Sequence, residues 1–325
     1  MQQLDATSGP SRICAVHDGR AGNARQALAL ARALDARAGE TAVQPGALAR
    51  WLAPRRWPLP PPSLGPASAA LRHAPPALAI GCGRQAALAT RLLRERGSRA
   101  VQILDPRIAP QHWDLLIVPE HDRLRGDHVV PMVGSLHPVD DDYLLCAISA
   151  FPALSMLPTP HTVLLVGGPS RQAAFTDAGF EALLQRLAAQ ARVEGGSFSA
   201  IASRRTPPAW RAALGRVDAA IAGLRWRDTG DGPNPYAGLL ANADRLVCTP
   251  ESVNMLSEAA ATHAPVFAWA VDTVQGRPRA FVDGLQARGR VRPLDDALAQ
   301  FDAAPLRETE RVAAIVRQRL SLPVP

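Results

Sequence analysis

Residues 163–168 read VLLVGG, and residues 246–258 read LVCTPESVNMLSE. In both stretches a short apolar run ends abruptly, in two glycines or in a Thr-Pro turn, and a helical pattern follows further on. A strand that passes through a turn into a helix is the building unit of parallel α/β folds. These two stretches therefore predict a parallel sheet covered by helices in the second half of the chain.

The same alternation runs through the whole chain. Apolar runs that predict strands lie at 13–16, 77–80, 101–104, 115–118, 129–133, 163–166, 198–202, 221–224, 246–248 and 266–269. Residues 151–160 contain three prolines and no periodicity, which is typical of an interdomain linker. We therefore expect an α/β protein of two Rossmann-like domains, 1–157 and 158–325, which face each other across a cleft.

Composition bounds the class of protein. The chain has 325 residues, 47% of them hydrophobic and 20% charged, which is typical of a globular protein of about two domains. The chain has no lysine, so its net charge of +7 reflects an excess of arginine over acidic residues. This charge is spread over both halves, so no nucleic-acid partner is indicated. The four cysteines form no CxxC pair, and neither a signal peptide nor a membrane span is recognisable. We therefore expect a cytoplasmic protein.

Ligands of open α/β sheets bind where loops gather at the carboxyl ends of the strands. In the first domain residues 17–23 (HDGRAGN) occupy such a place, and Gly19 and Gly22 allow a ligand to approach the backbone closely. Asp18 or His17 is a candidate general base for an acceptor hydroxyl. The alternative for Asp18 is that it only caps the turn.

Two further strand ends of the first domain carry polar residues. Gly83 and Arg84 follow the second predicted strand, where tight packing of helix on strand is the alternative to a role in the cleft. Glu120 and His121 follow the strand predicted at 115–118, and we expect them to line the cleft. Their spacing matches no established pattern of metal ligands, so we expect no metal.

The second domain carries the candidates for binding an anion. Gly168 follows a strand and suits either a phosphate loop or a plain turn. Ser203, Arg204 and Arg205 place hydroxyl and guanidinium groups at the next strand end, which suits a diphosphate, although a solvated turn has the same composition.

Two later segments complete this set. Asn234 and Tyr236 stand between a strand and a short helix, where an aromatic ring can stack on a base. Ser252, Val253 and Met255 open a helix that contains Glu258, six residues past Ser252. A helix start binds phosphates, and a carboxylate nearly two turns further on can accept hydrogen bonds from ribose hydroxyls. The alternative for Glu258 is an exposed helix residue.

Together these segments resemble a known family, the bacterial relatives of the plant "elongated mitochondria" fission factor. The matching motifs are Asp-Gly-x-x-Gly with a following Gln, Gly-Arg, Asp-Pro, Pro-Glu-His-Asp, Gly-Gly, Ser-Arg-Arg-Thr, Asn-Pro-Tyr and Thr-x-Asp-Ser-x-x-Met-x-x-Glu-Ala. They stand in this order over about residues 15–265. Glu251 departs from the pattern, because the family usually has Asp there, and Ala24 and Arg25 stand where its first helix is usually more polar.

The resemblance implies a GT-B architecture with an acceptor-side first domain and a nucleotide-sugar donor in the second. It implies an inverting, metal-independent glycosyltransferase without a cofactor, in which Glu258 holds the ribose of the donor. The identity of the acceptor is not implied, and a lipid-linked sugar is one candidate. The alternative is a non-catalytic scaffold that binds a protein or the inner membrane face, for which Trp51, Trp57 and the prolines of 54–62 are the motif. An NAD-dependent epimerase is poorly supported, because the chain has no GxGxxG after the first strand and no lysine for a Tyr-x-x-x-Lys pair.

Overall fold

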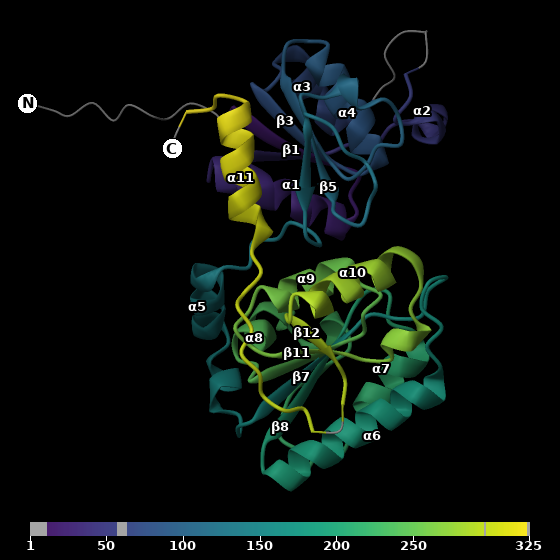
Figure 1. Ribbon diagram of the computed structural model, residues 1–325, viewed down its shortest axis with the longest axis vertical. Coiled ribbons are helices and arrows are strands. Elements are labelled where there is room, and N and C mark those ends of the chain that lie inside the picture. The colour runs from purple at the N-terminus through teal and green to yellow at the C-terminus, as the bar shows by residue number, and fades with distance from the viewer. Residues whose placement is uncertain (1–11, 57–63, 296, 324–325) are drawn as a thin grey trace, which may run out of the picture. The chain divides into compact units, whose positions relative to one another are not determined.

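The computed structural model describes residues 12–56, 64–295 and 297–323. The chain divides into two compact units (Figure 1). The first combines the residues up to Pro138 with those from Glu308 onward, and the second is Val139–Arg307. Each unit is built on a six-stranded parallel sheet with helices, which confirms the predicted α/β class.

The sheet of the first unit has the order β2-β1-β3-β4-β5-β6, and all its neighbours are parallel. Its strands are β1 (Ile13–His17), β2 (Gly39–Ala42), β3 (Leu78–Cys82), β4 (Arg99–Ile103), β5 (Leu115–Pro119) and β6 (Val129–Met132). Its helices are α1 (Ala21–Leu34), α2 (Ala47–Leu52), α3 (Ala69–His73), α4 (Arg84–Arg94) and α11 (Glu308–Arg319), with 3-10 turns η1 (Pro66–Ser68) and η2 (Pro110–His112). Strands β3 and β5 are buried at every residue, as in a sheet covered on both faces.

The sheet of the second unit has the order β12-β11-β10-β7-β8-β9 and is also parallel. Its strands are β7 (His161–Val166), β8 (Ser197–Ala202), β9 (Arg225–Trp226), β10 (Arg245–Cys248), β11 (Val266–Ala268) and β12 (Val291–Pro293). Its helices are α5 (Asp141–Ala150), α6 (Asp177–Glu194), α7 (Pro208–Gly215), α8 (Tyr236–Ala241), α9 (Val253–Ala260) and α10 (Gly276–Ala287), with 3-10 turns η3 (Pro152–Met156), η4 (Thr229–Asp231) and η5 (Val271–Thr273).

Each sheet has one point at which the order of strand addition reverses. In the first unit β1 lies between β2 and β3, and in the second unit β7 lies between β8 and β10. The connections from the two strands that meet at such a point lead away to opposite sides, and ligands of open α/β sheets bind there. The topology therefore directs attention to the loops after β1 and β3 and to those after β7 and β10.

Helix α6 shows how the sequence specifies the second core. Thr176 caps its start by accepting the N–H of Gly179 at 3.1 Å, and Gly195 ends it with φ of +65°. Phe180 stacks on the buried Trp210 with ring centroids 4.0 Å apart. The other buried residues recur at helical spacing and are Leu183, Leu184, Leu187 and Ala191.

The boundaries of the units differ from the expected break between residues 157 and 158. Helix α5 and turn η3, expected at the end of the first domain, belong to the second unit, where α5 packs on α8. Helix α11 returns to the first unit, because Val312 and Val316 are buried in its core and Arg317 Nη2 donates to the carbonyl of Ala33 at 3.1 Å. Because α11 and α1 are far apart in the sequence, no local sequence pattern predicts that they pack together.

The predicted strand at 221–224 is wrong, since the strand there is β9. Gly223 has φ of +134°, and a Cβ on it would lie 1.9 Å from the carbonyl oxygen of Phe198. Phe198 and Ala200 of β8 still donate their N–H groups to the carbonyls of Ala222 and Leu224 at 2.9 and 2.8 Å, but the positive φ of Gly223 interrupts the regular extended conformation. Strands β2 and β12, which lie at the sheet edges, were not predicted.

Only part of the proline-rich stretch is described. Trp51 lies in α2, whereas residues 57–63, including Trp57, are outside the described residues. No helix in the described ranges has the length and apolar character that crossing a bilayer requires.

Arg290 fixes the end of α9. It is 3% exposed, and its Nε and Nη2 donate to the carbonyls of Ala259, Ala260, Thr262 and Ala264 at 2.7–3.2 Å. Burial lowers the pKa of Arg290 to about 10, so its charge is kept at neutral pH. A cation at a helix C-terminus offsets the helix dipole and here also satisfies buried carbonyls.

We expect Arg290→Met to lower the free energy of unfolding by about 2–4 kcal/mol, because several buried carbonyl groups lose their donor. Urea unfolding followed by tryptophan fluorescence measures this. Arg288→Met, the same change at an exposed position two residues away, serves as the control and should cost less than about 1 kcal/mol. Equal effects of the two substitutions would contradict the structural role of Arg290.

Candidate functional site

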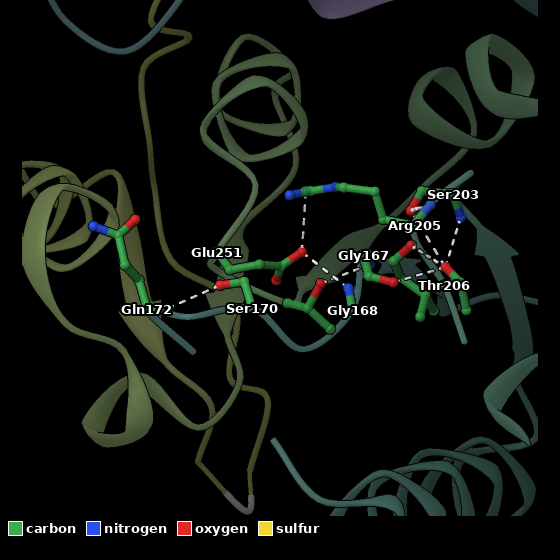
Figure 2. A network of polar contacts seen from close by, with 10 residues as sticks. Gly167, Gly168, Ser170, Gln172, Ser203, Arg205, Thr206 and Glu251 are labelled. Carbon is green, nitrogen blue, oxygen red and sulfur yellow. Dashed lines mark hydrogen bonds and ion pairs between the residues drawn. The ribbon is translucent and has the colours of Figure 1, made fainter. Parts of the chain in front are cut away.

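Three loops of the second unit meet at its reversal point. Because β7 pairs with both β10 and β8, the residues that follow these strands lie side by side. The segments are residues 167–170 after β7, 203–206 after β8 and 249–252 after β10. Figure 2 shows that residues of all three meet in one network of polar contacts, to which the loop after β7 contributes the backbone N–H groups of Gly167 and Gly168.

The two glycines after β7 bring the backbone against the loop after β10. Gly167 donates its N–H to Thr249 Oγ1 at 2.7 Å, and Gly168 donates its N–H to Glu251 Oε1 at 3.0 Å. A Cβ on Gly167 would lie 1.7 Å from that oxygen of Glu251, and one on Gly168 would lie 2.7 Å from the carbonyl oxygen of Arg205. A side chain at position 167 would displace the carboxylate of Glu251, and one at position 168 would displace the backbone of the loop after β8.

Glu251 is the centre of this network, although the sequence did not predict it as a site residue. Its side chain is 1% exposed, and Arg205 Nη2 lies 3.2 Å from Oε1 (Figure 2). The other oxygen, Oε2, is buried and has no hydrogen-bond partner within the described residues. Burial raises the pKa of Glu251, while the bond from Gly168 and the charge of Arg205 oppose the rise. The sequence feature that points to position 251 is the glutamate itself, because the family usually has aspartate there.

The turn after β8 is held from two sides. Thr206 Oγ1 accepts the N–H of Ser203 at 2.9 Å and lies 2.7 Å from the carbonyl oxygen of Gly167. Arg211 donates to the carbonyls of Ser203 and Thr206 at 2.6 and 3.1 Å. This fixed turn presents the exposed side chain of Arg204, which makes no hydrogen bond or ion pair with any described residue.

Helix α9 begins directly after Glu251. Ser252 is its N-cap, its side chain makes no capping hydrogen bond, and the first turn is half-buried at Val253 and Met255. The first N–H groups of a helix have no partner within it, so this start can accept an anion. Glu258 lies further along α9 and is 3% exposed, which excludes the alternative of an exposed helix residue.

Asn234 and Tyr236 lie at the start of α8. Asn234 Oδ1 accepts the N–H of Tyr236 at 2.9 Å, which is an Asx turn that opens the helix. Tyr236 is half-buried and Asn234 is exposed. The contacts of α8 are with α5, where a Cβ on Gly238 would lie 2.7 Å from Phe151.

In the first unit the residues after β1 and β3 meet in a similar way. Asp18 Oδ1 accepts the N–H of Arg20 at 3.2 Å and Asn23 Nδ2 at 3.0 Å, and its side chain is 4% exposed. Gly83 has φ of +92°, and a Cβ on it would lie 2.4 Å from Asn23 Nδ2 and 3.3 Å from Asp18 Oδ2. The structure therefore brings Asp18 and Gly83 together.

The other predicted residues of this region have identifiable contacts. Gly19 has φ of +78° and donates its N–H to His17 Nδ1 at 3.1 Å, while His17 Nε2 lies 2.8 Å from Glu40 Oε1. Gly22 is in the first turn of α1, where its carbonyl accepts Gln26 Nε2 at 3.4 Å. His17 is thus held between the turn after β1 and the side chain of Glu40 in β2.

Arg84 follows β3, whereas Glu120 and His121 follow β5, and β4 lies between these two strands. Arg84 Nη2 donates to the carbonyl of Arg50 at 2.9 Å and so fastens α2. Glu120 is exposed and its carbonyl accepts Arg125 Nη2 at 2.9 Å. His121 is half-buried, and burial lowers its pKa. No three His, Cys, Asp or Glu side chains of the described chain are grouped so that they could hold a metal ion.

Cysteine chemistry is disfavoured at both strand ends. Cys82 ends β3, and Cys248 ends β10. Burial raises the pKa of both thiols far above the ordinary value, and the charge of Asp18 or Glu251 adds to the rise. Thiols that stay protonated are poor nucleophiles.

Solved structures share this fold at low sequence identity. UDP-GlcNAc 2-epimerase from Methanocaldococcus jannaschii has a TM-score of 0.58 and 12% identity over 94% of this chain and 99% of that chain. The S. aureus MnaA-UDP co-structure has a TM-score of 0.53 and 12% identity, with 96% and 97% covered. Os79 from O. sativa in complex with UDP has a TM-score of 0.51 and 12% identity, with 94% and 91% covered. These similarities concern the fold and confirm the predicted GT-B class.

Sequence relatives agree with the motifs. The "Mitochondrial fission protein ELM1" of Arabidopsis thaliana is 28% identical over 286 residues, which cover 76% of this chain and 64% of that protein. The chain thus spans less than two thirds of the Arabidopsis protein. The "Uncharacterized protein RP120" of Rickettsia prowazekii (strain Madrid E) is 22% identical over 294 residues, with 76% and 81% covered.

A family model described as Mitochondrial fission ELM1 matches residues 21–320, which is most of the chain and includes all the strands from β2 to β12. Two six-stranded α/β units of the GT-B class and the motifs at their strand ends agree with this match. The chain belongs to the Mitochondrial fission ELM1 family.

Proposed function

We propose that this chain is an inverting, metal-independent glycosyltransferase whose nucleotide-sugar donor binds at the reversal point of the second unit. The observation that carries the proposal is the convergence there of Gly168, the two arginines 204 and 205, and the start of α9. Backbone N–H groups, guanidinium groups and a helix N-terminus are the groups that bind a diphosphate without a metal. The proposal needs no NAD or other cofactor.

The diphosphate is assigned to the three loops of this network. The start of α9 at Ser252 and Val253 supplies N–H groups, Ser203 supplies a hydroxyl, and Gly168 supplies an N–H that donates to Glu251 Oε1 until a diphosphate binds. Arg204 is exposed and has no counter-ion within the described residues, so its charge is available to a ligand. The developing charge of the leaving nucleotide would be stabilised by the same groups.

The nucleoside is assigned to α9 and α8. Glu258 lies about 9 Å along α9 from Ser252, from the rise of 1.5 Å per residue, and its carboxylate would accept bonds from ribose hydroxyls. Tyr236 is the candidate for stacking on the base, with Asn234 beside it. Met255 completes this surface in the first turn of α9.

Neighbouring folds suggest which nucleotide to test first. The MnaA structure and the Os79 structure both contain UDP, which supports a uridine nucleotide as the leading candidate for this chain. The M. jannaschii structure is named as a UDP-GlcNAc 2-epimerase. Epimerisation of the sugar, detected instead of transfer, would therefore replace the proposed reaction while keeping the donor site.

The acceptor is assigned to the first unit, with a lipid-linked sugar as one candidate. Asp18 is the proposed base, because His17 is held by Gly19 and Glu40 whereas Oδ2 of Asp18 has only a distant ion pair, with Arg20 Nε at 3.7 Å, within the described residues. Asp18 would take the proton of the acceptor hydroxyl as its oxygen bonds to the anomeric carbon. The bond from that carbon to the diphosphate breaks, and the nucleotide leaves with the electron pair. Gly19, Gly22, Gly83, Arg84, Glu120 and His121 are the proposed surroundings of the acceptor.

We expect the folded protein to bind a UDP-sugar and Glu258→Ala to weaken this binding by about 1–3 kcal/mol, because the bonds to ribose are lost. Titration calorimetry measures the affinity. The control is Glu181→Ala, the same change at an exposed glutamate of α6 that pairs with Arg216, and it should leave the affinity unchanged. Unchanged affinity in Glu258→Ala would remove Glu258 from the site. Failure of UDP-, GDP- and CMP-linked sugars alike to bind would overturn the donor proposal.

We expect Asp18→Asn to reduce sugar transfer by about 100-fold or more and to leave donor affinity unchanged, because the base is lost and the nucleotide site lies on the other unit. Asn keeps the oxygen that accepts Asn23 Nδ2, so the turn should persist. Transfer of labelled sugar to a membrane lipid extract and donor titration measure the two effects. An Asp18→Asn variant with undiminished transfer would rule out Asp18 as the base.

A second candidate function is a non-catalytic scaffold that binds an anionic membrane surface through α2. Leu48 and Trp51 are 62% and 74% exposed on this helix, and the neighbouring Arg50 and Arg55 are exposed. Tryptophan beside arginine is typical of the interface between lipid and water. This candidate corresponds to a cytoplasmic protein that is peripheral at the inner membrane face.

If α2 binds a membrane, the double substitution Leu48→Ala and Trp51→Ala should lower binding to phosphatidylglycerol vesicles by about 10-fold, because two apolar side chains no longer enter the bilayer surface. Vesicle sedimentation measures the bound fraction. Val193→Ala, at an exposed apolar position of α6, is the control. Undiminished binding of the double variant would exclude α2 as the docking helix.

A further inference from the structure

The carboxylate of Glu251 lies where a phosphate is expected. We propose that Glu251 is an internal anion that occupies the phosphate cradle of the second unit and takes up a proton when a nucleotide diphosphate binds. This inference rests on the proposed donor site and adds its regulation. No motif of the sequence assigned a role to this residue.

The first support is the set of donors around the carboxylate. Gly168 N–H and Arg205 Nη2 both point at Oε1, at 3.0 and 3.2 Å (Figure 2). A backbone N–H at the end of a strand and a guanidinium group would bind a phosphate oxygen in the same way. The carboxylate of Glu251 therefore accepts the hydrogen bonds that a diphosphate would otherwise accept from these two groups.

The second support is the space that the carboxylate fills. A Cβ added to Gly167 would lie 1.7 Å from Glu251 Oε1, so the carboxylate lies directly over the backbone of this glycine. Glycine at the end of a strand ordinarily lets a ligand approach the backbone. A diphosphate at this place would meet a buried negative charge, and like charges in such contact cost several kcal/mol.

The third support is the other carboxylate oxygen. Oε2 is buried and has no hydrogen-bond partner within the described residues, while the side chain as a whole is 1% exposed. A buried acceptor without a donor is costly. A proton on Oε2 removes that cost and turns the oxygen into a donor toward a phosphate oxygen, so the repulsion becomes a hydrogen bond.

The surroundings set the direction of the pH dependence. Arg205 is the charged group that faces Glu251, Cys248 is the titratable neighbour on β10, and Thr249 and Gly168 are neutral donors. Burial raises the pKa of Glu251. The neutral form therefore gains population as the pH falls through this raised pKa, and affinity for a diphosphate should rise in the same direction.

The test is titration calorimetry of the full chain with a UDP-sugar at pH 5.5 and pH 8, because a diphosphate esterified at both ends keeps its charge in this range. We expect the wild type to bind about 10-fold more tightly at pH 5.5 and to take up a proton, measured in buffers of different ionisation enthalpy. Glu251→Gln, which keeps the shape and removes the charge, should bind at pH 8 about 10-fold more tightly than the wild type, without proton uptake. Asp218→Asn removes the same charge from an exposed pair with Arg192 and should behave as the wild type.

The outcomes separate the two proposals. Wild-type binding that does not depend on pH, or Glu251→Gln binding no more tightly than the wild type at pH 8, would overturn the role of Glu251 alone. Absence of binding by both proteins at both pH values would overturn the donor site and this inference with it. The pH series of the wild type does not depend on the stability of any variant.

Discussion

One steric constraint recurs at both reversal points of the fold. At the end of one strand stands a glycine, and the carboxylate that follows the neighbouring strand lies against it. Gly83 faces Asp18 and Asn23 in the first unit, and Gly167 faces Glu251 in the second. Because parallel neighbours bring their carboxyl ends to the same edge, any side chain on these glycines would displace the side chains from which both candidate sites are built.

The two carboxylates differ in what surrounds them, and this difference assigns their proposed chemistry. Asp18 accepts a backbone N–H and an amide of its own turn, next to an 81% exposed Arg20. Glu251 is held by groups from two other strands and is excluded from solvent. A carboxylate fixed within one turn suits the proton transfer proposed for Asp18, whereas a carboxylate bonded to two other loops suits the role proposed for Glu251 in anion binding.

The sequence predicted what short-range patterns determine. Buried strands such as β3 and β7 contain apolar runs, and the glycines that follow them, Gly83 and Gly167, mark the turns. The edge strand β2 (GETA) has no such run, and the place of α11 depends on contacts with α1 from the other end of the chain. The sequence did not identify Glu251 as a site residue for the same reason. Its hydrogen bond is with Gly168, which lies 83 positions away in the sequence.

The chain belongs to a family named for mitochondrial fission, and that name specifies no reaction. The chemistry of this chain is therefore inferred from its own side chains. The groups proposed to bind a nucleotide lie on the second unit, and the exposed apolar side chains of α2 lie on the first. Each set can change without disturbing the core of the other unit, because each unit buries its own apolar residues. The proposed membrane docking and the proposed catalysis therefore depend on different side chains, and the role proposed for Glu251 concerns only the second of them.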